Sequence, residues 1–181
     1  RTLRWNWLGP SNIAGRMLCL AVNPADTNVL WAGSASSGLW KSCKGGRGPD
    51  SWEQVRLPMA ANAVSAIAID PVHPDTMYLG TGESYGYEPP LSGKYVRTMR
   101  GSYGIGILRS VDGGTSWSLM LDWRNHPERC IWKIEIDPAN PSVLYAASTH
   151  GIYKSHDHGN RWTQVSELKM VTDLVVRSDS T

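Results

Sequence analysis

Short apolar runs and polar turns alternate along the whole chain. The runs are rich in Val, Ile, Leu, Tyr and Trp and are bounded by Gly, Pro, Asn and Asp, which is typical of β-strands joined by tight turns. No persuasive helical periodicity competes with this pattern. We therefore expect strands at Met17–Val22, Val29–Gly33, Gly38–Ser42, Trp52–Val55, Ala66–Ile69, Met77–Gly80, Gly104–Ser110, Trp117–Leu121, Ile131–Ile136, Val143–Ala147, Gly151–Ser155, Trp162–Val165 and Val171–Val176.

The expected strands form a repeating unit of four. An Asn-Pro or Asp-Pro turn follows the first strand of each unit, at Asn23, Asp70 and Asp137. The unit recurs about every 46 residues, and the second copy carries about 20 extra residues between Glu83 and Gly104. Four-stranded units of this length are typical of propeller blades, with a solenoid as the competing architecture. The sequence predicts an all-β fold, a β-propeller of four-stranded antiparallel blades.

The repeat also divides the chain. We expect a lead-in at 1–17, a first blade at 18–64, a second at 65–127 with an insertion at 84–103, a third at 128–168 and the start of a fourth at 169–181. Propellers close with about four to eight blades, so these residues are expected to form part of a larger propeller. The remaining blades would come from the same chain or from another subunit, because three blades alone expose strand edges.

One turn design occurs three times, each time between the third and fourth strands of a unit. Two copies share a Ser, an Asp, a Gly and a Trp at the same spacing, namely Ser110, Asp112, Gly114 and Trp117, then Ser155, Asp157, Gly159 and Trp162. A third, degraded copy at 42–46 has Lys44 in place of the acid. The carboxylate can accept hydrogen bonds from turn amides and the glycine permits positive φ. We expect these residues to be structural, with the two Trp side chains packed between sheets.

Composition narrows the possible partners. The chain has nine Trp, seven Tyr and no Phe, and its formal net charge is only +2. The charge and the absence of a basic run argue against nucleic acid, and no apolar stretch is long enough for direct insertion into a membrane. The three cysteines argue against a disulfide framework, leave room for one bridge and match no zinc pattern.

These turns resemble the Asp-box (BNR) repeat found in sialidases, xyloglucan-hydrolysing propellers, the sortilin luminal domain and a photosystem II assembly factor. The stretches at 9–16, 32–42 and 80–84 are similar to large secreted bacterial Asp-box proteins. The resemblance implies a propeller with the boxes on its outer hairpins. It also implies an extracellular or cell-surface location, in a secreted bacterial protein.

The resemblance does not supply a catalytic residue. A sialidase would need an Arg-Ile-Pro motif, which is absent, and the xyloglucanase pattern expects an aspartate where this chain has Ala35–Ser37. Glu83, Glu88 and Asp122 are candidate carboxylates, but ordinary glycoside hydrolysis needs a spaced pair. The sequence 156–158, His-Asp-His, is expected to be a solvated turn. We expect no metal site and no cofactor.

The insertion is the candidate binding segment. Tyr and Arg are enriched in binding hot spots, and long loops in compact repeats are often functional. The candidate residues are Tyr85, Tyr87, Tyr95, Arg97, Arg100 and Tyr103. The expected function is a non-catalytic module that binds a protein or a glycan. The alternative is a glycoside hydrolase whose catalytic carboxylates lie outside this segment, so enzyme activity stays open.

Overall fold

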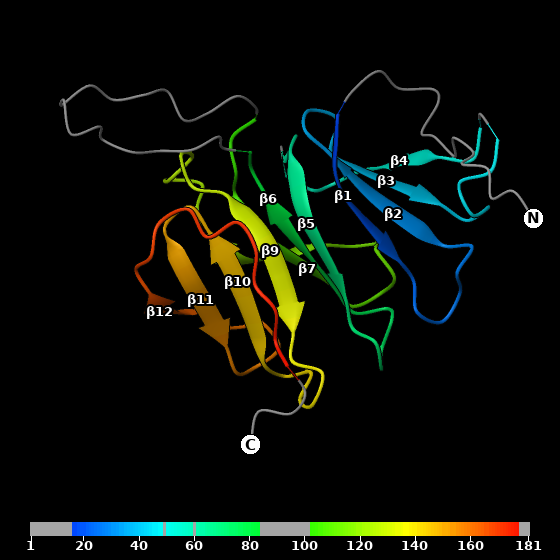
Figure 1. The fold of residues 1–181 in the computed structure, drawn as a ribbon. Helices are drawn as coiled ribbons and strands as arrows, with labels where there is room; N and C mark the ends of the chain where they lie inside the picture. Colours follow the sequence, from blue (N-terminus) through cyan, green and yellow to red (C-terminus); the bar gives the residue numbers. More distant parts are fainter. Residues whose placement is uncertain (1–15, 49, 60, 84–101, 178–181) are drawn as a thin grey trace, which may run out of the picture.

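The computed structural model describes residues 16–48, 50–59, 61–83 and 102–177, and there the chain forms three antiparallel sheets of four strands each (Figure 1). The first sheet consists of β1 (Met17–Val22), β2 (Leu30–Ser34), β3 (Leu39–Ser42) and β4 (Glu53–Val55). The second consists of β5 (Val64–Ile69), β6 (Met77–Thr81), β7 (Gly106–Ser110) and β8 (Ser118–Asp122). The third consists of β9 (Ile131–Ile136), β10 (Leu144–Ser148), β11 (Gly151–Ser155) and β12 (Thr163–Ser166). The predicted all-β fold is confirmed.

Local sequence determines where these strands begin and end. Each observed strand differs from its predicted range by at most two residues at either end. The expected strand at Val171–Val176 is wrong, because residues 171–177 carry no regular secondary structure. The apolar pattern is present there, but a strand also needs a neighbour with which to exchange backbone hydrogen bonds. In this segment the Val171 N–H donates to the carbonyl of Ser148, and the Leu174 N–H donates to the side chain of Asp173 rather than to a neighbouring strand.

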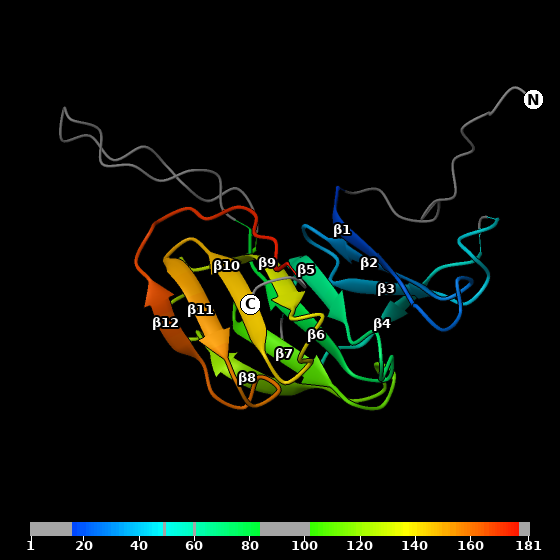
Figure 2. The same cartoon turned by 60° about the horizontal axis from the view of Figure 1, so that its bottom comes forward.

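The three sheets fan out from their first strands. β1, β5 and β9 lie next to one another in the middle of the molecule, whereas β4 and β12 lie on opposite sides (Figures 1 and 2). Each sheet pairs its strands in chain order from the innermost to the outermost. This arrangement is that of neighbouring blades around a common axis.

Two apolar layers join the sheets face to face. The layer between the first and second sheets includes Trp31, Leu79 and Trp117, and the layer between the second and third includes Tyr78 and Leu144. The second sheet is therefore covered on both faces, and all five residues of β6 are buried. Successive side chains of a strand point to opposite faces of the sheet, so a strand is buried along its whole length when both faces are covered.

The first sheet has an apolar face turned away from the second. On β1, Leu20 is 63% exposed and Val22 is 49% exposed, whereas Ile134 on β9 is only 3% exposed. Ala32, Trp40 and Trp52 form a small separate cluster in this sheet. Within the described ranges, no helix has the length and apolar character to cross a membrane.

Candidate functional site

The candidate site lies at one end of the three sheets. Here the second strand of each sheet turns into the third, and the chain passes from one sheet to the next. We call this end the rim, and define it by residues 35–38, 55–59, 61–63, 82–83, 102–105, 123–130 and 149–150. The three serine-containing turns lie at the opposite end, so the rim and the repeated turns are separate surfaces.

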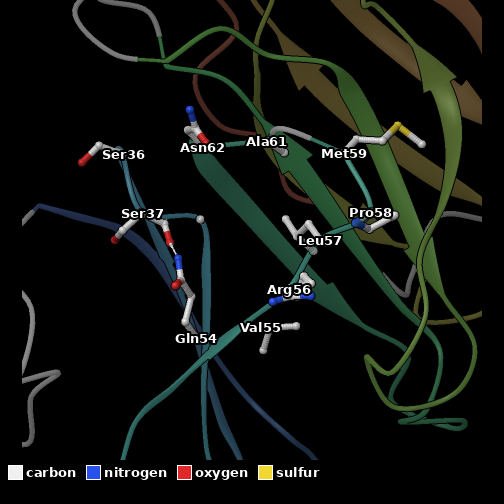
Figure 3. Close-up of a pocket in the computed structure, with 11 residues that line it drawn as sticks. Ser36, Ser37, Gln54, Val55, Arg56, Leu57, Pro58, Met59, Ala61 and Asn62 are labelled. Atoms are coloured by element: carbon white, nitrogen blue, oxygen red, sulfur yellow. Dashed lines mark hydrogen bonds between the residues drawn. The ribbon is translucent and has the colours of Figure 1, made fainter.

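An open pocket lies on the rim of the first sheet, with a volume of about 510 Å³ (Figure 3). Its polar walls come from the turn after β2 and from the end of β4, and its apolar wall from the passage to β5. The lining residues are Ser36, Ser37, Gly38, Gln54, Val55, Arg56, Leu57, Pro58, Met59, Ala61 and Asn62. None of these side chains is acidic. The pocket can therefore bind a polar ligand that also has apolar surface, but its described lining offers no carboxylate for acid–base chemistry.

Hydrogen bonds fix the shape of this pocket. Gln54 Nε2 donates to the Ser37 carbonyl at 2.8 Å, as Figure 3 shows, so the outermost strand is tied to the turn after β2. The Ser34 hydroxyl accepts from the Ser37 N–H at 2.7 Å. Gly38 has φ of 72° and donates its N–H to the Asn62 carbonyl at 2.8 Å. The turn after β2 and the passage to β5 are thus held together by backbone hydrogen bonds.

Glu83 lies two residues after the end of β6 and is buried on the rim. Its side chain forms an ion pair with Arg16, which precedes β1, so the pair joins the first and second sheets. The Arg16 side chain is 49% exposed and that of Glu83 is 1% exposed. Burial raises the pKa of Glu83, and the Arg16 guanidinium opposes that shift. A buried carboxylate paired in this way serves the contact between sheets.

Asp122, at the end of β8, is exposed and paired locally. Both of its oxygens accept hydrogen bonds from the Arg124 side chain, with 2.6 Å between Arg124 Nη2 and Asp122 Oδ2. These bonds, followed by one from the Arg124 backbone, lower the pKa of Asp122 to about 2. This carboxyl group stays ionised at neutral pH, so it is poorly suited to donate a proton there.

Most of the predicted binding residues lie outside the described part of the chain. These are Tyr85, Tyr87, Tyr95, Arg97 and Arg100. Tyr103, the last residue of the insertion, is described, lies on the rim and is 63% exposed. Nothing in the structure tests the binding role of these six residues, which stays a prediction.

The two ends of the insertion meet in a hydrogen-bonded neck. The Thr81 hydroxyl accepts from the N–H groups of Ile105 at 2.9 Å and Gly106 at 3.0 Å, and donates to the Gly106 carbonyl at 2.7 Å. Glu83 N–H donates to the Ser102 carbonyl at 3.3 Å. The insertion therefore leaves and rejoins the sheet at fixed points on the rim.

The three repeated turns share hydrogen bonds to a serine hydroxyl. Ser110 Oγ accepts from the N–H of Gly114 at 2.9 Å, and Ser155 Oγ accepts from the N–H of Gly159 at the same distance. In the degraded copy, the Ser42 hydroxyl accepts from the Gly46 N–H at 3.0 Å. The loss of the acid at position 44 therefore leaves the serine part of the turn intact.

The two aspartates of these turns are engaged inside their own turns. Asp112 accepts from the Ser116 N–H at 2.9 Å and from its hydroxyl at 2.6 Å, which, with a bond from Ser110, lowers the pKa of Asp112 to about 2. Asp157 accepts from the Arg161 N–H at 2.8 Å, and its pKa is also lowered, chiefly by that bond. Neither carboxylate faces the rim pocket.

The tryptophans beside these turns differ in burial. Trp117 is 7% exposed, lies in the layer between the first and second sheets and donates from Nε1 to the Gly114 carbonyl at 3.1 Å. Trp162 is half-buried against the layer between the second and third sheets.

No metal site is found among the residues that the structure describes. No group of three or more His, Cys, Asp or Glu side chains there could hold an ion. His156 and His158 are exposed in the third turn, and His158 has φ of 55°. Cys19, Cys43 and Cys130 are all free thiols, so the single bridge left open by the sequence is not formed.

Comparison with known proteins relates the chain to one kind of enzyme. No family model matches it. Over 128 residues the chain is 32% identical to a protein from Paenibacillus sp, and the match covers 67% of this chain and 11% of that protein. Over 159 residues it is 29% identical to a protein from Hypocrea jecorina, and the match covers 81% of this chain and 17% of that protein. A third, from Acetivibrio thermocellus, is 30% identical over 112 residues. All three are xyloglucanases. The chain thus spans 11–17% of the length of the two xyloglucanases named first.

Solved structures give the same fold. The chain superposes on an ancestral GH74 enzyme with a TM-score of 0.63 at 22% identity, covering 83% of this chain and 18% of that one. With the GH74 xyloglucanase from Xanthomonas campestris the TM-score is 0.58 at 20% identity, and the match covers 90% of this chain and 22% of that one. At this identity the likeness concerns the fold alone. Together with the three fanned sheets, it confirms that the chain is part of a β-propeller.

Sequence reasoning missed the rim pocket and the Arg16–Glu83 pair. The pocket residues Gln54, Arg56 and Asn62 belong to no motif, and only their position at the end of the first unit could have singled them out. The ion pair joins residues that are far apart in the sequence, so no local sequence pattern predicts it.

Proposed function

We propose that this chain is a non-catalytic, glycan-binding part of a glycoside hydrolase that acts on xyloglucan-like polysaccharides. The observation that carries the proposal is the similarity to xyloglucanases from three organisms, at 29–32% identity. The whole protein's activity is proposed, because the chain corresponds to a small part of those enzymes. An extracellular location is part of the proposal, since polysaccharides of this kind are too large to enter a cell.

The rim pocket is the proposed contact with the glycan. Sugars present hydroxyl groups at their edges and C–H groups on their ring faces. The pocket offers hydrogen-bonding groups on Ser36, Arg56 and Asn62 beside the apolar side chains of Leu57 and Met59. This combination of a few polar groups with apolar surface is typical of small-molecule sites.

The catalytic carboxylates are proposed to lie outside this segment. The turn after β2, where the xyloglucanase pattern expects an aspartate, contains Ala35–Ser37 and lines the pocket with serines. Glu83 and Asp122 are each paired with an arginine. Hydrolysis with a pair of carboxylates would then depend on other blades.

A second candidate is a protein-binding module that uses the insertion. The observation that favours it is the exposure of Tyr103 beside the hydrogen-bonded neck. This role would not need catalysis, so an inactive full-length protein that still captured a protein partner through the insertion would support it.

The experiment compares two arginines in the full-length protein. Binding and hydrolysis of xyloglucan are measured for the wild type, for Arg56→Ala in the pocket and for Arg47→Ala in the exposed turn region at the other end of the first sheet. Loss of one hydrogen bond costs about 1 kcal/mol, so Arg56→Ala should weaken binding about fivefold while Arg47→Ala leaves it unchanged. Absence of xyloglucan binding and hydrolysis in the wild type would refute the proposal. Equal effects of the two variants would refute the role of the pocket.

A further inference from the structure

Each sheet carries an aromatic residue on its second strand and a cationic residue opposite it on its third. Cross-strand pairing places the members of each pair side by side. The pairs are Trp31 with Lys41, Tyr78 with Arg109, and Tyr145 with Lys154. We call each an aromatic–cation pair. All three occupy the same register in their sheets, and in the first two sheets the aromatic member lies on the face turned toward the next sheet.

The first pair holds the serine turn of the second sheet. Lys41 Nζ lies 4.6 Å from the centre of the Trp31 ring and donates to the Gly113 carbonyl at 3.4 Å. Gly114 packs flat on Trp31, because a Cβ atom at position 114 would overlap the Trp31 ring. Trp31 is only 2% exposed as a result.

The second pair holds the serine turn of the third sheet in the same way. The Tyr78 hydroxyl donates to the His158 carbonyl at 3.1 Å, and Arg109 Nη1 donates to the same carbonyl at 2.7 Å. A Cβ on Gly159 would come within 3.1 Å of Tyr78 Cε1. Tyr78 is 1% exposed. In both contacts, the cation binds the carbonyl of the residue before the glycine, and the aromatic ring covers the glycine.

The third pair has no such turn upon it among the described residues. Lys154 Nζ lies 4.9 Å from the centre of the Tyr145 ring, which repeats the geometry of the first pair. Tyr145 is half-buried, unlike the buried Trp31 and Tyr78, whereas Lys154 has the same intermediate burial as Lys41 and Arg109. The third sheet therefore has the aromatic–cation pair, but no glycine turn among the described residues packs on it.

The chain after β12 runs back toward this face. Met170 and Val171 donate their N–H groups to the carbonyls of Thr149 and Ser148, beside the end of β10. Asp173 lies close enough to Lys133 on β9 to raise the pKa of that lysine, after the larger effect of Glu135. Residues 170–173 thus lie along the third sheet.

We propose that Tyr145 and Lys154 hold the serine turn of a fourth four-stranded unit, encoded after residue 181 in the same protein. The turn would have a Ser four residues before a Gly, as in Ser110 and Gly114. Its glycine would cover Tyr145, and the carbonyl before that glycine would accept a hydrogen bond from Lys154. The xyloglucanases that the chain matches are much longer than it, which leaves room for such a unit in one chain.

Photo-cross-linking in the full-length protein tests this. A lysine analogue with a diazirine replaces Lys154 in one sample, Lys41 in a second and Arg109 in a third, and the cross-linked peptides are identified by mass spectrometry. The internal standards should link position 41 to the peptide containing 113–114 and position 109 to the peptide containing 158–159. Position 154 should link, in a yield comparable to that of position 41, to a Ser-x-x-x-Gly turn after residue 181.

Every other result overturns the proposal. A link from position 154 to residues 42–46 of a second copy would mean that two chains complete the ring. A link to any other peptide, or none while position 41 reacts, would mean that the third pair is not a receptor. Failure of the link at position 41 would refute the contact itself.

Discussion

At the residue scale, Gly114 meets two separate requirements. Its φ of 84° lies in the left-handed region, and its missing side chain lets the turn lie flat on the Trp31 ring. The neighbouring Gly113 meets only the first, with φ of 66° and Asp75 Oδ1 3.2 Å from where a Cβ would stand. Substitutions at Gly113 and Gly114 can therefore distinguish the cost of backbone strain from the cost of disturbing the contact between sheets.

Gly114→Ala should destabilise the protein more than Gly113→Ala. An alanine in the left-handed region costs about 1–2 kcal/mol, and forcing a methyl group against a packed ring adds about 1–3 kcal/mol. Thermal unfolding of the two variants measures the difference. Equal losses of stability would show that the turn does not pack on Trp31.

Asp112 should stabilise the fold only while it is ionised. Hydrogen bonds hold its pKa at about 2 in the folded protein, below the ordinary value of 3.8. Its contribution is therefore complete above about pH 4 and is lost as the pH falls toward 2. The melting temperature of the wild type should exceed that of Asp112→Asn at pH 7, and the gap should narrow between pH 4 and pH 2. A gap that is independent of pH would contradict the hydrogen-bonded carboxylate.

At the element scale, Thr81 closes the neck of the insertion with one hydroxyl group. Thr81 is fully buried, and its bond with the Gly106 N–H is buried, whereas its bond with the Ile105 N–H is part-buried. Thr81→Val keeps the shape of the side chain and removes the acceptor for both donors. The expected loss is about 1–3 kcal/mol of unfolding free energy for the buried Gly106 donor, with a smaller addition from the part-buried Ile105 donor.

Thr81→Ser is the matched control, since it keeps the hydroxyl group. Denaturant unfolding of both variants should show a much smaller loss for Ser than for Val. If the valine variant is as stable as the serine variant, the neck is not held by this hydroxyl.

The features of these elements that could be predicted from the sequence are those that depend on residues close together in the chain. The strand positions and the Ser-to-Gly turns depend on apolar runs and on residues within a few positions of one another. The Arg16–Glu83 pair joins residues 67 positions apart, and the contact of Trp31 with Gly114 joins different sheets. Such contacts depend on how the sheets pack. The strand expected at Val171–Val176 failed for the same reason, because its pattern was present and its partner strand was not.

At the scale of the whole molecule, three similar sheets are joined by similar contacts. Apolar layers lie between neighbouring sheets, and each layer is closed by a serine turn seated on an aromatic–cation pair. The first sheet leaves apolar residues exposed, and the third leaves its pair uncovered. The chain is thus built as an arc of a propeller, with the pocket proposed to bind a glycan on the rim and the turns at the other end.

The central functional claim is that this arc binds a polysaccharide without supplying catalytic carboxylates. The most direct measurement is kcat on xyloglucan for the full-length protein carrying Glu83→Gln or Asp122→Asn, at a temperature where each variant is folded. Removal of a general acid or base lowers kcat by about 10²–10⁴-fold. We predict that either variant keeps kcat within about tenfold of the wild type, because we propose that the catalytic carboxylates lie in other blades. A loss of a hundredfold or more in either variant would place the chemistry in this segment and contradict the account.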